Sequence, residues 1–273
     1  MEKRELPFLI ILALPVLIVT IAFFLLPMAR LAVIAASGES GFSAYLEVFT
    51  KPRYLESLIS TTLLAGITTI VTLAISTVAG LFLQRNQFFG RGLLVSLLTF
   101  PLAFPGVVVG FMVILLAGRQ GLIGEVTKYL TGDKLVFAYS IAGLFVGYVY
   151  FSIPRVILTI MAASEKLDPA LEEAARSLGA SPWLVVRDVI LPALKPALIA
   201  SGAIAFATAM GAFGTAFTLA TDIDVLPMTI YTEFTLRANI ATAAALSIVL
   251  GLITWLVLNV ARSMAGSTVA AAG

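Results

Sequence analysis

Few residues in this chain of 273 could do chemistry. It contains no Cys and no His, which excludes disulfides, thiolate and imidazole metal ligands, a Cys nucleophile and a Ser-His-Asp triad. The only candidates for an acid–base cluster are Asp222, Asp224 and Glu233, and we expect these three carboxylates to be solvated loop charges. We therefore expect no catalytic residue, no metal site and no cofactor.

Two further classes of function are excluded by what the sequence lacks. It contains no Gly-Lys dipeptide, so it cannot form the Walker A loop that holds nucleotide phosphates. The formal net charge is +2, and no run of basic residues forms the stripe that nucleic-acid binding needs. We expect no nucleic-acid partner.

The elements that position the remaining residues are long and apolar. Hydrophobic residues make up 60% of the chain and charged residues 12%, against roughly 25% charged in soluble domains. A helix needs roughly 20 apolar residues to cross a bilayer core. Most of the charge lies between the apolar stretches, as the cost of a charge at mid-bilayer requires. The sequence predicts an all-α membrane protein with six transmembrane helices, near 6–29, 57–83, 93–117, 135–160, 196–220 and 239–261.

The ends of the chain are predicted to lie in the cytoplasm. The first apolar stretch is longer than the 7–15 residues of a typical signal-peptide core, so we expect it to remain as a membrane helix. With the N-terminus inside, ten of the 17 Lys and Arg residues fall on the inner side and seven on the outer side. The tight loop 84–92 carries two Arg and no acid, as expected for an inner loop.

Two spans are unusual enough to suggest a translocation pathway. Pro101 and Pro105 in the third span remove two backbone donors, so the helix must kink or break where protein or water satisfies the freed carbonyls. In the fifth span, small residues allow close helix packing. Packing and pathway lining both remain open there, and the pathway candidates in this span are Gly211, Ala212, Phe213 and Gly214.

Other polar residues within the spans are interpreted more simply. The second span carries many hydroxyls, which we expect to act in helix packing rather than in pathway lining. Arg155 is the charge nearest to the middle of a span, and we expect it to extend to the lipid headgroups rather than to bind an anion. An ion-coupled secondary transporter would normally bury acids, His or paired charges. That alternative stays open, although the sequence shows no clear set of such residues.

The connection 161–195 has the features of two short helices. Asp168 and Ser181 each precede a proline and can cap a helix start, and Gly179 between them is a natural helix stop. In the first helix Leu171, Ala174, Ala175 and Leu178 share one face. A helix of about ten residues is marginal alone, so we expect this face to dock on a partner.

Residues 172–192, EEAARSLGASPWLVVRDVILP, resemble the EAA loop of ABC importer permeases. The family pattern is Glu-Ala-Ala, three residues, Gly, nine residues, Ile, any residue, Leu-Pro. Val189 replaces the Ile. The residues that match the pattern, and that the resemblance implies contact the ATPase, are Glu173, Ala174, Ala175, Gly179, Leu191 and Pro192.

The resemblance implies a type I (MetI-like) fold in a bacterial inner membrane. Residues 1–56 would form an N-terminal helix and an external loop, 57–262 a five-helix core with the coupling loop 161–195, and 263–273 a cytoplasmic tail. The partners would be an ABC ATPase dimer, a second permease subunit and an extracytoplasmic solute-binding protein. The chain would not itself be an enzyme, but part of an ATP-hydrolysing translocase.

The sequence indicates the transported substrate less directly than it indicates the fold. Residues 101–110 and 117–124 resemble the branch that includes molybdate, sulfate, polyamine and ferric-iron permeases. Many of that branch carry an acid after the glycine in the fifth span, whereas this chain has Ala212. We favour a polyamine-like solute, with an oxyanion or phosphonate second and ferric iron also open.

Overall fold

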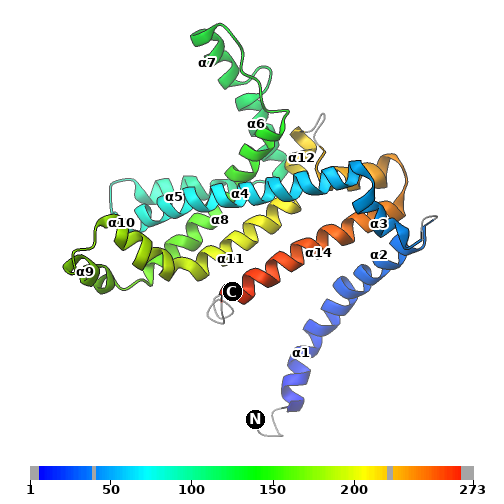
Figure 1. The fold of residues 1–273 in the computed structure, drawn as a ribbon, viewed down its shortest axis with the longest axis horizontal. Coiled ribbons are helices and arrows are strands. Elements are labelled where there is room, and N and C mark those ends of the chain that lie inside the picture. The colour runs from blue at the N-terminus through cyan, green and yellow to red at the C-terminus, as the bar shows by residue number, and fades with distance from the viewer. Residues whose placement is uncertain (1–5, 39–40, 220–223, 266–273) are drawn as a thin grey trace. The chain divides into compact units, whose positions relative to one another are not determined.

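The computed structural model describes residues 6–38, 41–219 and 224–265. Every regular element in these ranges is helical (Figure 1). This confirms the all-α prediction and the six spans. Lys3, Arg4, Asp222 and most of the predicted tail lie outside the described residues. Six helical segments are long and apolar enough to cross a membrane: Leu12–Ala36, Pro52–Arg85, Gly106–Thr131, Ile141–Glu165, Pro182–Met210 and Ile240–Ala265.

The chain divides into two compact units. The first comprises Met1–Ser57 and Thr229–Leu252, and the second comprises Leu58–Met228 and Ile253–Gly273. Two long helices contribute to both units, α4 (Pro52–Arg85) and α14 (Ile240–Ala265). The other elements of the first unit are α1 (Leu6–Thr20), the π-turn η1 (Ile21–Leu25), α2 (Leu26–Ala36), α3 (Ser43–Thr50) and the π-turn η4 (Thr232–Leu236).

Glu233 is buried in the first unit, which corrects the expectation of a solvated loop charge. Its side chain is 1% exposed, and its Oε1 lies 3.0 Å from Nη1 of Arg237 and 3.7 Å from Nη1 of Arg53. A buried carboxylate needs such partners, because an unpaired charge out of water is costly. In the same unit Lys51 donates to Glu47, which raises the pKa of the Lys51 ammonium above its usual value.

The second unit contains the helices that the sequence singled out. The third expected span is two helices joined by a 3-10 turn, and a short helix that the sequence did not predict, α7, follows them. The fifth expected span begins earlier and ends at Met210 rather than near 220. The elements in order are α5 (Arg91–Thr99), η2 (Phe100–Ala103), α6 (Gly106–Ala117), α7 (Leu122–Thr131), α8 (Ile141–Glu165), α9 (Pro169–Ser177), α10 (Pro182–Val185), the π-turn η3 (Val186–Ile190), α11 (Leu191–Met210) and α12 (Phe213–Leu219), with α13 (Leu226–Tyr231) at the border of the two units.

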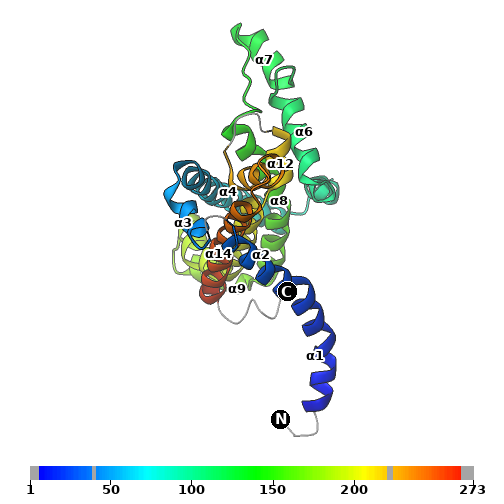
Figure 2. The ribbon, with the colours of Figure 1, turned by 90° about the vertical axis from the view of Figure 1, so that its right-hand side faces the viewer.

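Packing in the second unit joins the membrane helices to the loop 161–195. Helix α8 packs against α11 (Figure 1). Helix α6 packs against α12 and α8 (Figure 2). Buried side chains from α8, α10, η3 and α11 form one apolar cluster, which we call the inner core: Val156, Ile160, Val185, Ile190, Leu194 and Ala205. Leu73 and Leu81 of α4 pack on it.

The hydroxyls of α4 mostly serve packing, as expected. Thr61 Oγ1 accepts from the Leu226 amide at 2.7 Å, and Ser76 donates to the Ile153 carbonyl at 3.4 Å. Thr62 and Thr69 donate to carbonyls one turn earlier in α4 itself. These bonds link α4 to other elements or satisfy the hydroxyl within its own helix.

Candidate functional site

The loop 161–195 has the local structure that its sequence predicts. Asp168 accepts from the Ala170 amide at 2.9 Å and Ser181 from the Leu184 amide at 3.4 Å, so each caps the start of a helix. Gly179 has φ of +85°. The Ala180 amide donates to the Ala175 carbonyl across it at 3.1 Å, which is the pattern of a helix closed by a left-handed glycine.

One side of this loop is attached to the inner core. Ala175, Ala180 and Val189 are partly buried against it. Leu191 is half-buried and Pro192 is exposed, and both lie at the start of α11. These contacts attach α9 and the segments that follow it to the inner core, which contains side chains of α8 and α11.

The other side of the loop exposes large apolar side chains. Leu178 is 89% exposed, Trp183 65% and Leu171 57%, and Ala174 is also exposed. The apolar face predicted for α9 is therefore divided, with Ala175 on the inner core and the others in the open. Large apolar side chains that stay exposed on a loop are typical of a docking site. We call Leu171, Leu178 and Trp183 the outer face.

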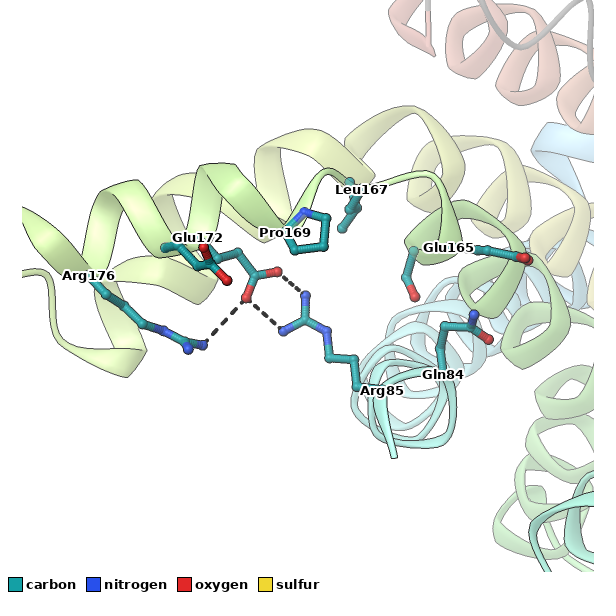
Figure 3. Close-up of a pocket in the computed structure, with 9 residues that line it drawn as sticks. Gln84, Arg85, Glu165, Leu167, Pro169, Glu172 and Arg176 are labelled. Atoms are coloured by element: carbon teal, nitrogen blue, oxygen red, sulfur yellow. Dashed lines mark hydrogen bonds and ion pairs between the residues drawn. The ribbon is translucent and has the colours of Figure 1, made fainter. Parts of the chain in front are cut away.

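A forked ion pair ties this loop to the end of α4 (Figure 3). Nη1 of Arg85 lies 3.1 Å from Oε2 of Glu172, and Nη2 of Arg85 pairs with Oε1. Arg176 approaches the same carboxylate at 3.5 Å. Two parallel bonds from a guanidinium fix direction as well as distance.

The sequence did not predict this pair. Arg85 is one of the two Arg residues of the tight loop 84–92, and nothing in the sequence connects it with Glu172. Glu173 was the carboxylate expected to make a contact, either within the loop or to the partner. Glu173 lines a pocket together with Arg85, Glu172 and Arg176, but no ion pair joins its carboxylate to a residue in the described part of the chain. Its Glu-Ala-Ala position therefore remains available to a partner.

A second site is the helix-break pocket, where the interrupted third and fifth spans meet. The third span breaks between Thr99 and Gly106, as the prolines predict. Pro101 is buried in η2, and Pro105 immediately precedes α6. The chain also leaves helix between Met210 and Phe213, a break that was not predicted. The pocket is lined by residues of α8 and of both breaks, among them Gly106, Tyr148, Thr208 and the four pathway candidates at 211–214.

Hydroxyls from neighbouring elements donate to backbone carbonyls beside both breaks. Tyr148 donates to the Ala212 carbonyl at 2.8 Å, and Thr215 donates to the Gly106 carbonyl at 2.9 Å. Irregular backbone at membrane depth is tolerated only where protein or water supplies such partners. Gly106, after the first break, and Gly214, after the second, lie close together: a Cβ added to Gly214 would be 3.4 Å from the Gly106 carbonyl carbon. A Cβ added to Gly214 would come within 3.0 Å of the Val107 amide nitrogen.

In the described ranges no three acidic side chains come together in a way that could hold a metal ion. The loop can bind another protein, and the helix-break pocket can form part of a passage. Docking on one surface and a passage at another suit a transport subunit.

A family model described as "Binding-protein-dependent transport system inner membrane component" matches residues 76–266. The chain belongs to this family. The matched range contains both the loop and the helix-break pocket, and it confirms the predicted resemblance to ABC importer permeases. The ion-coupled carrier is thereby set aside, and the chain is a multi-pass inner-membrane permease subunit.

The permease is similar to several anion permeases. It is 33% identical to the sulfate transport system permease protein CysT of Escherichia coli over 199 residues, covering 73% of this chain and 70% of that protein. It is 35% identical to the E. coli molybdenum permease ModB over 171 residues, covering 61% and 74%. It is 33% identical to the chloroplastic sulfate permease 2 of Chlamydomonas reinhardtii over 214 residues, covering 76% of this chain and 57% of that protein. These relatives give no support to the expected polyamine preference.

Solved structures confirm the fold. The permease aligns with a chain of a bacterial alginate ABC transporter with a TM-score of 0.79 at 19% identity, covering 96% of this chain and 94% of that one. It aligns with a chain of the MetNI methionine ABC transporter with a TM-score of 0.54 at 17% identity, covering 76% and 90%. The MetI-like architecture expected from the resemblance is thus the observed one.

Proposed function

We propose that this permease forms part of the translocation pathway of an ATP-driven importer for tetrahedral oxyanions of the sulfate or molybdate type. The names of the similar permeases support this substrate class. The lining of the helix-break pocket supports it as well, because no carboxylate is among the residues that line it. A polyamine carries several positive charges and would need acidic partners in such a desolvated place.

The ATPase that drives transport is a separate dimer, and it docks on the loop 161–195. The outer face supplies apolar contact, and Glu173, Ala174 and Gly179 lie on or beside it. Ala175, Leu191 and Pro192 hold the loop to α11, so that ATPase closure moves the membrane helices. Within the five-helix core of residues 57–262, the Arg85–Glu172 pair passes the same movement to α4. This is a two-state device biased by ATP.

The remaining partners complete the importer. A second permease subunit, identical or paralogous, surrounds the pathway from the other side, with Pro101, Pro105 and residues 211–214 near it. A solute-binding protein delivers the substrate from outside. Both termini and the loop 161–195 lie in the cytoplasm, in agreement with the Lys and Arg count.

The exposure of the outer face is the observation on which this function rests most directly, and crosslinking tests it. Leu178→Cys in this Cys-free chain should form a crosslink to a copurifying ATPase subunit when membranes are treated with a short thiol–amine reagent. The matched control is Leu130→Cys, on the exposed part of α7 at 72% exposure, which should give no such product. Crosslinking in the Leu130→Cys variant and none in the Leu178→Cys variant would reject the docking site.

A further inference from the structure

Arg155 lies deep within α8 and is not accounted for by the sites above. It follows Pro154 and stands ten residues before the last residue of the helix, Glu165. At about 1.5 Å per residue this is roughly 15 Å from the helix end, which is about half the thickness of a bilayer hydrocarbon core. The side chain is only partly exposed. A charge at this depth is rare and usually functional.

The contacts of Arg155 do not match an arginine that extends toward the cytoplasmic headgroups. Its Nη1 donates to Oγ1 of Thr208 at 3.0 Å. Thr208 stands two residues before the end of α11 at Met210, directly beside the second helix break. Side chains on a helix lean toward its N-terminus, and this direction carries Arg155 away from Glu165 and toward the break.

The guanidinium therefore reaches the edge of the helix-break pocket. Thr208 lines that pocket, and so do Phe151 and Ser152, which precede Arg155 by about one turn of α8. In the part of the chain that the structure describes, no carboxylate lies within ion-pair distance of Arg155, whereas the four arginines discussed above, Arg53, Arg85, Arg176 and Arg237, each have one. Arg155 thus supplies a positive charge whose remaining N–H donors are not used by an acid.

We infer that Arg155 is an anion-binding residue of the translocation pathway, contacting a tetrahedral oxyanion as it passes the helix breaks. A planar guanidinium presents two parallel donors that match two oxygens of such an anion. Thr208 orients the side chain. A single fixed charge offsets the cost of bringing a dianion into a low-dielectric region, and it is weak enough to release the ion again. This inference rests on the proposed oxyanion substrate.

Uptake into proteoliposomes tests it with the assembled complex of permease, ATPase and binding protein. Labelled sulfate and molybdate are the probes. Arg155→Gln should lower uptake of the transported oxyanion roughly 10-fold or more, the effect of losing a charged hydrogen bond, while Arg155→Lys should retain more uptake than Gln. The matched control is Arg119→Gln, which removes the same charge from an exposed loop and should leave uptake unchanged.

The outcomes separate the inference from the proposed function. If the wild type imports an oxyanion and Arg155→Gln imports it equally well, Arg155 is not in the pathway and the inference falls alone. If the wild type imports neither sulfate nor molybdate, the proposed substrate class falls, and the inference with it.

Arg155→Cys keeps the inference testable if the Gln variant does not reach the membrane. In this Cys-free chain the introduced thiol should react with water-soluble methanethiosulfonates. A cationic aminoethyl reagent should restore uptake and an anionic sulfonatoethyl reagent should not. An Arg155→Cys variant that reacts with neither reagent would place the side chain away from any aqueous path and overturn the inference.

Discussion

At the scale of single residues, Gly179 is required by its left-handed backbone conformation and not by crowding from neighbouring atoms. Its φ is +85°, and no atom lies within 4 Å of where a Cβ would stand. Gly179→Val is therefore expected to act through backbone strain alone, about 1–2 kcal/mol, and to weaken copurification of the ATPase while the permease still inserts. Gly179→Asn should be tolerated, because Asn visits this region more readily.

Gly92 provides the matched control for this prediction. A Cβ added there would also stand in open space, but the φ of Gly92 is not positive. Gly92→Val should leave ATPase association unchanged. Equal loss in both variants would show that side-chain bulk, and not the left-handed turn, is responsible.

The Arg85–Glu172 pair is a second prediction at this scale. Breaking it with Arg85→Gln or Glu172→Gln should loosen α9 from α4 and lower substrate-stimulated ATP hydrolysis. The pair is partly exposed, so its contribution to stability should be about 1 kcal/mol rather than that of a buried pair. The exchange Arg85→Glu with Glu172→Arg should recover part of the stimulation, since the fork is restored in reverse. No recovery in the exchange would argue against a direct pair.

At the scale of elements, the two glycines that follow α11, Gly211 and Gly214, should behave differently. A Cβ on Gly214 would press on Val107 at 3.0 Å, whereas on Gly211 the nearest atom is the Ala207 carbonyl oxygen at 3.7 Å. Gly214→Leu should thus disturb the packing of α12 on α6 and reduce the amount of folded permease. Gly211→Leu should fill the helix-break pocket and reduce uptake with little change in thermal stability.

Stability in detergent and uptake, measured for both variants, decide this prediction. Full uptake by Gly211→Leu would place that residue outside the pathway. A normal melting temperature for Gly214→Leu would contradict the close approach of the two helices.

The sequence predicted elements well where local chemistry decides them. The proline break at 101–105, the caps at Asp168 and Ser181 and the turn at Gly179 each follow from one residue type. The break after Met210 was missed because Gly-Ala-Phe-Gly is apolar and looks like a continuous span. The one side-chain bond to its backbone comes from Tyr148, 64 residues earlier in the chain, which donates to the Ala212 carbonyl in the described structure.

The Leu-Pro end of the motif has a physical explanation at this scale. The π-turn η3 directly precedes Leu191-Pro192, and η1 directly precedes Leu26-Pro27. A proline lacks an N–H and its ring crowds the carbonyl four residues earlier. A widened turn before it relieves that crowding while the helix continues.

At the scale of the whole molecule, Glu233 shows why burial of a single charge is hard to predict. Nothing near it in the sequence marks it as buried, and one of the two arginines that pair with it in the described structure, Arg53, lies 180 residues away. Partner proteins are harder still to predict from the sequence, because the only sign of them in this chain is an exposed surface such as the outer face. The kinds of partner are therefore inferred from membership in the permease family and not from the chain's own surface.

Topology is the prediction that belongs to this scale. Single Cys substitutions at the exposed positions Asp133, Gln87 and Ser177 should divide into two classes with an impermeant thiol reagent. The Asp133→Cys variant should react from outside, and the Gln87→Cys and Ser177→Cys variants only after the membrane is opened. Reversed labelling would invert the orientation and move the loop 161–195 away from any cytoplasmic ATPase.

The central claim is that this chain is the permease of an ATP-driven oxyanion importer, and transport itself tests it most directly. The complex of permease, ATPase and binding protein should be assembled in liposomes and supplied with labelled sulfate, molybdate or spermidine. We predict uptake of sulfate or molybdate that requires ATP hydrolysis and the binding protein, with no uptake of spermidine. Uptake of spermidine in place of both oxyanions, or oxyanion uptake driven by an ion gradient without ATP, would contradict the account.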